Sequence, residues 1–323
     1  MEACIIVTYR CNAKCHMCNT WQFPSKPADE ITPEIVAKLP SGLKFINITG
    51  GEPFLRTDLD KIVEVALTKT ERLVISSNGY FTDRMVALAK KFPQIGVRIS
   101  IEGLPAANDQ LRGIKDGFDK GLRSLLELKA LGLKDIGFGM TVSDVNAKDM
   151  IELYHLADSM GLEFATASTH NSYYFHKNDN AFKDPEMIAG EFEKLSGELL
   201  KTRKLKNWFR AYFNHGMANY VRGGKRLLPC EVGTDMFFVD PYGMVMPCNG
   251  MDKEAPMGDL TKQTFDEIWN SDQAQKVRDS VKHCDKNCWM IGSVAPAMKK
   301  EMLTPIKWII KRKLSGTSEC ACG

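Results

Sequence analysis

Short apolar segments alternate with longer amphipathic segments along the N-terminal part of the chain. The apolar segments are rich in Ile, Val, Phe and Thr and end in turn or polar residues, as strands do. They are residues 3–9, 44–48, 72–76, 97–101, 136–142 and 163–167. Apolar positions recur at helical spacing in residues 33–39, 59–68, 84–92, 118–131, 147–160 and 185–201. Repeated strand–helix units require a parallel sheet with right-handed crossovers. The pattern therefore predicts an α/β fold over residues 1–202, a partial (β/α)6 barrel similar to a TIM barrel.

Three polar features follow predicted strands directly. They are a run of cysteines after the first strand, the turn Gly50-Gly51-Glu52-Pro53 after the second, and Asn78-Gly79 after the third. The carboxyl ends of parallel strands meet at one face of a barrel, where the chemistry of such folds lies. We therefore expect these three features to form one site.

The cysteine run places Cys11, Cys15 and Cys18 in a C-x3-C-x2-C pattern. Three thiolates can hold three irons of a 4Fe–4S cluster and leave the fourth iron for a substrate or cofactor. Zinc or a redox thiol group is the alternative, although zinc sites usually close with four ligands from two pairs. His16 lies between two of the cysteines and is badly placed to be the fourth ligand.

The pattern changes at about residue 203. Residues 203–229 form a basic, aromatic-rich connector, and residues 230–292 contain a second cysteine set: Cys230, Cys248, Cys284 and Cys288. Residues 235–239 and 244–246 predict a hairpin, and residues 264–282 predict a short helical pair. Two separated cysteine pairs brought together in this way bind either zinc or an iron–sulfur cluster, and the spacing does not decide between them.

The first cysteine run, the Gly-Gly-Glu-Pro turn and Asn78 together resemble the radical S-adenosylmethionine (SAM) superfamily. The resemblance implies a 4Fe–4S cluster on Cys11, Cys15 and Cys18, with SAM on the open iron. It implies that Glu52 accepts a hydrogen bond from the SAM amino group, while the glycines let backbone approach the ligand. The residues that it assigns to SAM are Gly50, Gly51, Glu52, Asn78, Ser100, Glu102 and Arg112. The alternative for Arg112 is a surface salt bridge.

The second cysteine set resembles the auxiliary-cluster domains of the twitch and SPASM subfamilies, because Gly243 lies between Cys230 and Cys248 at the spacing typical of them. This resemblance implies a second 4Fe–4S cluster held by Cys230, Cys248, Cys284 and Cys288, able to accept an electron from a substrate radical. Structural zinc is the alternative.

The family resemblance implies reductive cleavage of SAM to a 5′-deoxyadenosyl radical, with electrons from a donor such as flavodoxin or ferredoxin. We expect hydrogen abstraction from a small polar substrate, carbohydrate-type or phosphorylated, followed by oxidation or epimerisation. Oxidation needs a base, for which His170, Tyr173 and Tyr174 are candidates. Epimerisation needs a thiol, and the candidates are Cys4, Cys320 and Cys322. A peptide-modifying maturase and a non-catalytic iron–sulfur or zinc scaffold are the alternative functions.

The composition of the chain indicates which kinds of binding partner to expect. The formal net charge of 323 residues is only +3, so nucleic acid is not an expected partner. Ten cysteines without a recognisable signal peptide favour metal ligands in a reducing cytoplasm. The cations of the connector predict either a solvated helix face or a phosphate-binding wall.

The last segment, residues 293–323, contains a basic amphipathic helix. It is predicted at residues 299–313, where one acidic residue stands among lysines, one arginine and a tryptophan. This composition is typical of peripheral contact with a membrane surface, and docking on the flank of the barrel is the alternative.

Overall fold

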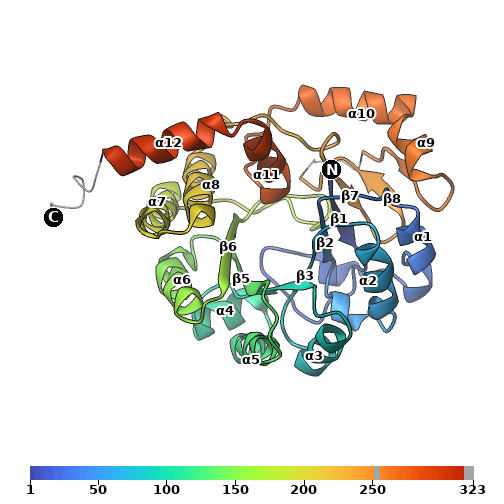
Figure 1. The fold of residues 1–323 in the computed structure, drawn as a ribbon, viewed down its shortest axis with the longest axis horizontal. Coiled ribbons are helices and arrows are strands. Elements are labelled where there is room, and N and C mark those ends of the chain that lie inside the picture. The colour runs from blue at the N-terminus through green and yellow to red at the C-terminus, as the bar shows by residue number, and fades with distance from the viewer. Residues whose placement is uncertain (251–254, 316–323) are drawn as a thin grey trace.

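The predicted partial barrel of parallel strands is confirmed (Figure 1). The computed structural model describes residues 1–250 and 255–315. Within them one nine-stranded sheet has the order β6-β5-β4-β3-β2-β1-β7-β8-β9. The six barrel strands are β1 Glu2–Ile6, β2 Phe45–Thr49, β3 Leu73–Ser77, β4 Gly96–Ser100, β5 Ile136–Val142 and β6 Glu163–Ser168.

The predicted barrel helices are present with small shifts of their ends. They are α1 Pro33–Ala37, α2 Leu59–Leu67, α3 Thr82–Lys91, α5 Gly117–Ala130, α6 Met150–Ser159 and α7 Pro185–Lys201. Short 3-10 turns are η1 Thr20–Gln22, η2 Pro27–Asp29, η3 Pro53–Leu55 and η4 Ala147–Asp149. One helix was missed: α4, Pro105–Arg112, follows β4 and starts with proline at its first turn, a favoured position.

The segment that carries the second cysteine set adds three strands to the barrel sheet, and Cys230 and Cys248 lie on either side of the first two. β7 Met236–Val239 pairs parallel with β1, and β8 Met244–Met246 and β9 Gly258–Asp259 follow it in antiparallel order. The hairpin therefore forms where it was predicted, but as an extension of the barrel. The helical pair is α9 Phe265–Trp269, which begins with a Thr264–Glu267 capping box, and α10 Asp272–Lys282.

The connector is mostly helix. α8, Leu205–Val221, packs along α7 and buries Ala211, Phe213 and Met217. The helix predicted at 299–313 is in fact two helices, α11 Ile291–Lys300 and α12 Leu303–Leu314. α11 contacts β7, and its Lys299 pairs with Glu2 at the start of β1. No helix within the described ranges has the length and apolar character needed to cross a membrane.

The interior of the barrel is hollow. In closed barrels of this kind, branched side chains fill the interior in layers. Here the inward positions of β5 and β6 include Gly139, Ala165 and Ala167, and those of β2 and β3 carry Asn47 and Ser76. Small side chains leave the space open, and the resulting cavity measures about 2010 Å³.

Trp289 attaches the second cysteine set to the helices of the barrel. It follows Cys288 directly, is fully buried, and donates from its indole Nε1 to the carbonyl of Phe213 on α8 at 2.9 Å. A Cβ atom built on Gly216 would lie 2.0 Å from the indole. Only glycine at this position lets the tryptophan lie against the helix.

We therefore predict that Gly216→Ala lowers the free energy of unfolding by about 1–3 kcal/mol, because the added methyl group displaces Trp289. Gly197→Ala on α7 is the matched control, since no atom lies within 4 Å of its added Cβ. That change should raise the free energy by about 0.5–1 kcal/mol, as glycine lowers helix stability relative to alanine. Urea unfolding followed by circular dichroism measures both, and equal effects of the two variants would contradict the packing role.

Candidate functional site

The first cysteine loop is held in place by α4. Lys14 and His16 donate their backbone N–H groups to the carbonyls of Arg112 and Leu111, at 3.0 and 2.9 Å. Gly113 ends α4 with φ +56°, and a Cβ atom there would lie 2.4 Å from the Lys14 carbonyl oxygen. The helix that the sequence did not predict therefore fixes the loop that carries Cys11, Cys15 and Cys18, which all line the cavity.

The two glycines after β2 make room for this chain's own backbone. A Cβ atom on Gly50 would lie 2.6 Å from the Thr8 carbonyl oxygen, and one on Gly51 would lie 2.2 Å from that of Arg10. The expectation that these glycines serve the approach of a ligand is thus incomplete, because the close contact is to the segment leading to Cys11. The carbonyl of Gly50 also accepts the hydroxyl of Tyr174 at 2.7 Å.

Glu52 lies behind the cavity wall. Its fully buried carboxylate accepts from the backbone N–H of Asn78 at 2.7 Å, the hydroxyl of Ser77 at 2.8 Å and the backbone N–H of Phe54 at 3.1 Å. Burial raises the pKa of this carboxyl, and the three donors oppose that shift. The carboxylate joins the ends of β2 and β3 and is not part of the cavity lining, and its direct contact with the SAM amino group stays a prediction.

The other residues assigned to SAM line the cavity. Asn78 donates from Nδ2 to Asn12 in the cysteine loop at 2.7 Å, and Ser100 lies at the end of β4. Arg112 is only 12% exposed and pairs with Glu102 at 3.1 Å, so it is not a surface ion pair. Burial lowers the pKa of Arg112, but Cys15 and Glu102 raise it above its usual value. A permanent cation beside Cys15 stabilises a thiolate there.

The four cysteines of the second set line the same cavity. Burial raises the pKa of Cys248 to about 12, and the neighbouring thiolates of Cys230, Cys288 and Cys284 act in the same direction. The backbone N–H of Gly250 donates to the sulfur of Cys248 at 3.0 Å. Backbone donors to sulfur are one means by which proteins adjust the potential of an iron–sulfur cluster. The charges of Cys284 and Cys288 both reach Cys248, so the ends of the second cysteine set approach one another at the cavity.

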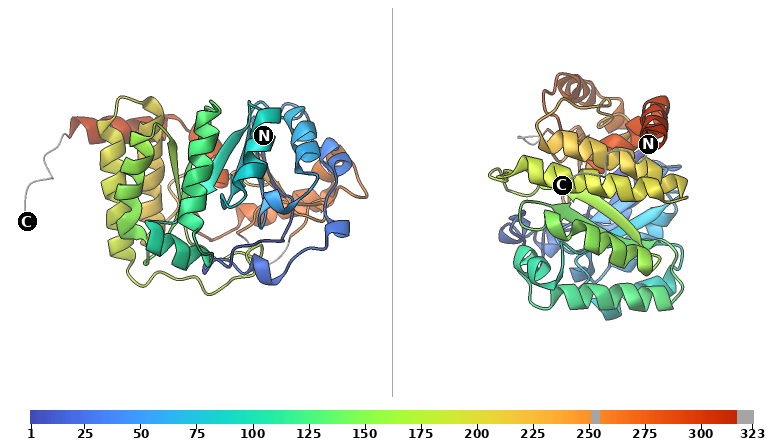
Figure 2. Two further views of the ribbon diagram at one scale, coloured as in Figure 1. Left: turned by 90° about the horizontal axis from the view of Figure 1, so that it is seen from below. Right: turned by 90° about the vertical axis from the view of Figure 1, so that its left-hand side faces the viewer.

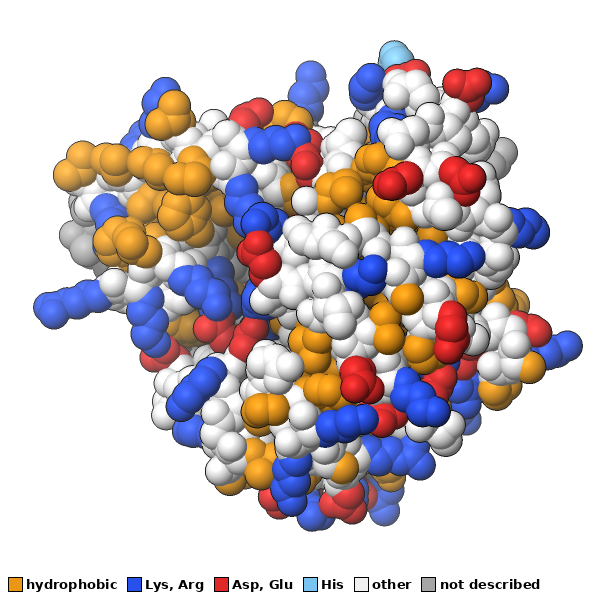
Figure 3. Space-filling view, turned by 45° about the vertical axis from the view of Figure 1, so that its right-hand side comes forward, with side chains coloured by type: hydrophobic (Ala, Val, Ile, Leu, Met, Phe, Trp, Pro, Cys, Tyr) orange, Lys and Arg blue, Asp and Glu red, His pale blue; other side chains and the backbone are white. Residues whose placement is uncertain are grey.

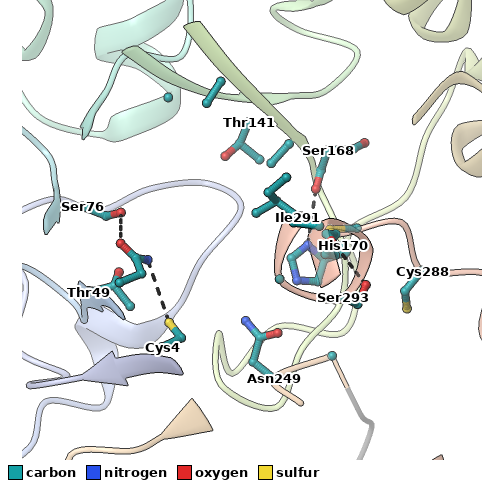
Figure 4. Close-up of a pocket in the computed structure, with 18 of the residues that line it drawn as sticks. Cys4, Thr49, Ser76, Thr141, Ser168, His170, Asn249, Cys288, Ile291 and Ser293 are labelled. Atoms are coloured by element: carbon teal, nitrogen blue, oxygen red, sulfur yellow. Dashed lines mark hydrogen bonds between the residues drawn. The ribbon is translucent and has the colours of Figure 1, made fainter. Parts of the chain in front are cut away.

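Of the candidate bases, His170 has a free ring nitrogen at the cavity. Its Nδ1 faces the Ser168 carbonyl at 3.3 Å, and its buried Nε2 has no hydrogen-bond partner among the described residues (Figure 4). Burial lowers its pKa, so the ring is neutral at pH 7. Tyr174 lines the cavity with its hydroxyl engaged by Gly50. Tyr173 packs against the cluster of Cys4, Met236, Phe238 and Met246 and is not part of the cavity lining, and its role as a base stays a prediction.

Of the candidate thiols, Cys4 lies in the cavity wall. It stands on β1, is 7% exposed, and packs against Met236, Phe238 and Met246. Burial raises its pKa to about 12, so it remains a thiol. Figure 4 shows it across the cavity from His170. Cys320 and Cys322 lie outside the described residues.

Sequence reasoning missed several residues of the site. Glu30 lies buried beneath the cysteine loop and accepts from Ser25 at 2.6 Å and Arg10 at 2.8 Å. Ser168, like His170, has a buried side-chain atom without a partner among the residues described. Asn12 stands between two cysteines, which was the available signal for its role. Glu30 gave none, because Arg10, its charged partner in the cysteine loop, lies 20 residues away in sequence.

Two family models match this chain. The radical SAM superfamily model matches residues 5–157, and the SPASM iron–sulfur cluster-binding domain matches residues 230–289. This chain belongs to the radical SAM superfamily. Its cofactors are accordingly a 4Fe–4S cluster with SAM in the barrel and auxiliary iron–sulfur in the C-terminal domain, and the cysteine sets described above fit both.

Several relatives resemble this radical SAM enzyme. It is 34% identical to Fe-coproporphyrin III synthase of Methanosarcina barkeri over 160 residues, 47% of this chain and only 39% of that protein. It is 28% identical to pre-heme d1 synthase of Dinoroseobacter shibae over 302 residues, covering 81% of this chain and 71% of that one. Native anSMEcpe with bound AdoMet and Cp18Cys peptide shares the fold, with a TM-score of 0.65 over 96% of this chain and 99% of that chain at 14% identity.

We predict that Glu52→Gln reduces SAM cleavage at least tenfold, because an amide N–H would face a backbone donor and loosen the Asn78 turn. Iron content should stay at the wild-type level, since no cysteine is changed. The exposed Glu34→Gln on α1 is the control and should cleave SAM normally. The rate of SAM cleavage is measured as 5′-deoxyadenosine formed, quantified by chromatography. Normal cleavage by Glu52→Gln would show that the carboxylate is dispensable.

Proposed function

We propose that this radical SAM enzyme oxidises its substrate by two electrons in the cavity between the two cysteine sets. The observation that carries the proposal is that Cys11, Cys15 and Cys18 line the same cavity as Cys230, Cys248, Cys284 and Cys288. A substrate held there lies between the site of hydrogen abstraction and a group able to accept an electron.

The bound cofactors would supply a radical that takes one hydrogen atom and a cluster that takes one electron. The chain itself must remove the remaining proton, and His170 is the residue we assign to this step. Its Nε2 is buried and has no partner in the described structure, and its lowered pKa keeps it neutral. An alcohol or amine that loses a hydrogen atom from carbon, then one electron to the cluster and one proton from oxygen or nitrogen, becomes a carbonyl or an imine.

The cavity is larger than a site for one small metabolite. Ligand sites usually measure about 300–1,000 Å³, so a volume of about 2010 Å³ holds SAM together with a sizeable substrate. The two curated relatives reported above are named for porphyrin and heme synthesis. These names support a substrate of such a size over the carbohydrate-type metabolite that the sequence led us to expect.

Epimerisation is the second candidate, and the position of Cys4 is the observation that favours it. A neutral thiol in the cavity wall is a hydrogen-atom donor for a substrate radical, and Cys4 faces His170 across the cavity (Figure 4). The two candidates make opposite demands on these residues, because oxidation needs the base and epimerisation needs the thiol.

Iron counting tests the two-cluster arrangement. After anaerobic reconstitution we expect about eight irons per chain in the wild type and about four when Cys11, Cys15 and Cys18 are all changed to Ala. Only the wild type should form 5′-deoxyadenosine from SAM. About four irons in the wild type and none in the variant would assign the second cysteine set to zinc and remove the electron acceptor.

Substituting the candidate base and the candidate thiol one at a time distinguishes oxidation from epimerisation. With a secondary alcohol that the wild type converts as the trial substrate, His170→Gln should lose product while still cleaving SAM, and Cys4→Ala should keep both activities. Because burial lowers the pKa of His170, the rate should be independent of pH near 7 and fall only as the pH drops below about 6.5. Mass spectrometry in D2O reads the outcome: deuterium gained at carbon, and lost in Cys4→Ala, would establish epimerisation.

We also propose that α12 contacts an anionic membrane surface. Its buried face docks on α8, where Trp308 stacks on His215 with ring centroids 4.8 Å apart (Figure 2). Its outer face exposes Leu303 by 70%, Ile310 by 52% and Leu314 by 81%. Figure 3 shows hydrophobic side chains gathered with Lys and Arg at this end of the molecule. An apolar stripe beside Lys307, Lys311 and Lys313 is complementary to anionic lipid.

Vesicle sedimentation measures this contact. Changing Leu303, Ile310 and Leu314 together to Ser should lower binding to phosphatidylglycerol vesicles more than tenfold, because each side chain loses apolar burial in the interface. The control Leu126→Ser, at a position 51% exposed on α5, should bind like wild type. Equal binding by the triple variant, or equal binding to neutral phosphatidylcholine vesicles by the wild type, would contradict the proposal.

A further inference from the structure

The side chains that line the cavity are strongly basic. Among the described residues only Glu2, Glu102 and Asp285 supply negative charge to the lining. The same lining contains eleven positively charged side chains: Lys44, Arg72, Arg98, Arg112, Lys206, Arg210, Lys225, Arg226, Lys282, Lys286 and Lys299. An unbalanced set of cations around a cavity attracts an anion into it.

Part of this charge has a partner in the cysteine sets. Arg112 pairs with Glu102 and acts on Cys15. Arg226 and Lys286 lower the pKa of Cys288, against the larger effect of its burial. These cations offset the negative charge of thiolates, so they do not need a further anion.

Six of the other cations lie at the opposite end of the barrel, where the strands begin. Lys299 pairs there with Glu2, and Lys44 with Glu71. Four more cations share only two carboxylates. Arg72 contacts Asp135 at 2.7 Å and Arg98 contacts it at 2.5 Å, while Lys206 at 2.8 Å and Arg210 both contact Glu163.

Each of these two groups therefore carries one positive charge more than its carboxylate neutralises. Their cations line the same cavity. Burial lowers the pKa of Arg210, and the charges of Arg98 and Arg72 add to that effect, against the attraction of Glu163. Cations gathered on one cavity wall repel one another, and a bound anion would relieve that repulsion.

We infer that Arg72, Arg98, Lys206 and Arg210 form a binding site for an oxyanion group of the substrate, a carboxylate or a phosphate, at the amino ends of the barrel strands. This inference rests on the proposed function, because it takes the cavity to be the substrate site. The substrate then extends along the barrel, with its anionic end here and its reacting carbon toward Cys11, Cys15 and Cys18.

The interior of the barrel leaves a path between the two ends. Short polar side chains along it include Asn47, Ser76 and Ser100. Ser76 donates to Asn47 Oδ1 at 3.0 Å, and a Cβ atom added to Gly139 would meet only one atom, at 3.9 Å. Guanidinium forks bind carboxylate and phosphate in a bidentate manner, which fixes orientation as well as position. The anion site would thus hold the reacting carbon at a set distance from the cysteines.

The test is calorimetric titration of the reconstituted, SAM-saturated enzyme with inorganic phosphate and, separately, with succinate. We expect binding of at least one anion, weakened about fivefold or more in Arg98→Gln and in Arg210→Gln. Removing a competing carboxylate should have the opposite effect, so Asp135→Asn and Glu163→Gln should bind more tightly. If one of these two variants does not fold, the other alone tests whether removing a carboxylate tightens anion binding. The matched control is Arg123→Gln, which breaks an exposed ion pair with Glu127 on α5 and should leave binding unchanged.

The two anions identify the chemistry. Preference for phosphate assigns a phosphorylated substrate, and preference for succinate assigns a carboxylate. The inference would be overturned if the wild type bound neither phosphate nor succinate, or if the Arg98 and Arg210 variants bound them as tightly as the wild type. Anion binding does not depend on turnover, so an enzyme that binds phosphate at this site but holds one cluster would refute the proposed oxidation and leave the anion site standing.

Discussion

The buried carboxylate of Glu52 sets the geometry of the barrel mouth. Burying a carboxylate costs several kcal/mol unless donors compensate for lost water. Here two backbone N–H groups and a hydroxyl do so. The Asn78 N–H follows the end of β3 and has no strand partner of its own. One side chain on the turn after β2 thus fixes the start of the next loop, and Asn78 is aimed at Asn12 in the cysteine loop.

This fixed mouth compensates for a hollow interior. A barrel without interior side-chain layers gives up the packing that stabilises closed barrels. The described structure replaces it with polar ties between loops: Tyr174 to the Gly50 carbonyl, Arg112 to Glu102, and Glu30 to Arg10. Such ties are directional, so they hold the loops in one arrangement while leaving the cavity open. Stability and a large binding space are obtained from different parts of the molecule.

The barrel could be predicted because its strands and helices carry their own periodicity. The spacing of Cys11, Cys15 and Cys18 likewise indicated an iron–sulfur cluster. The failures have physical causes. α4 has only eight residues and buries only Asn108 and Leu111, which is too little for a helical pattern. α11 contains Pro296, which argues against a helix in sequence although the structure keeps one there. Tyr174 and Gly50 are 124 residues apart, and no local pattern reports such a contact. For Glu52, sequence gave its position at the strand end but not whether it faces the cavity or the core.

The continuity of the sheet has a consequence for electron transfer. β7 pairs with β1 over the four residues from Glu2 to Ile5, and the first cysteine loop follows β1 while Cys230 and Cys248 flank the β7–β8 hairpin. Because electron transfer depends steeply on distance, two clusters on separate mobile domains would exchange electrons with a substrate at varying rates. Backbone hydrogen bonds between β1 and β7 join the strands next to the first cysteine loop and to Cys230 and Cys248, and Trp289 ties the end of the second set to α8. The sheet pairing and Trp289 thus give both cysteine sets connections to the barrel that borders the cavity.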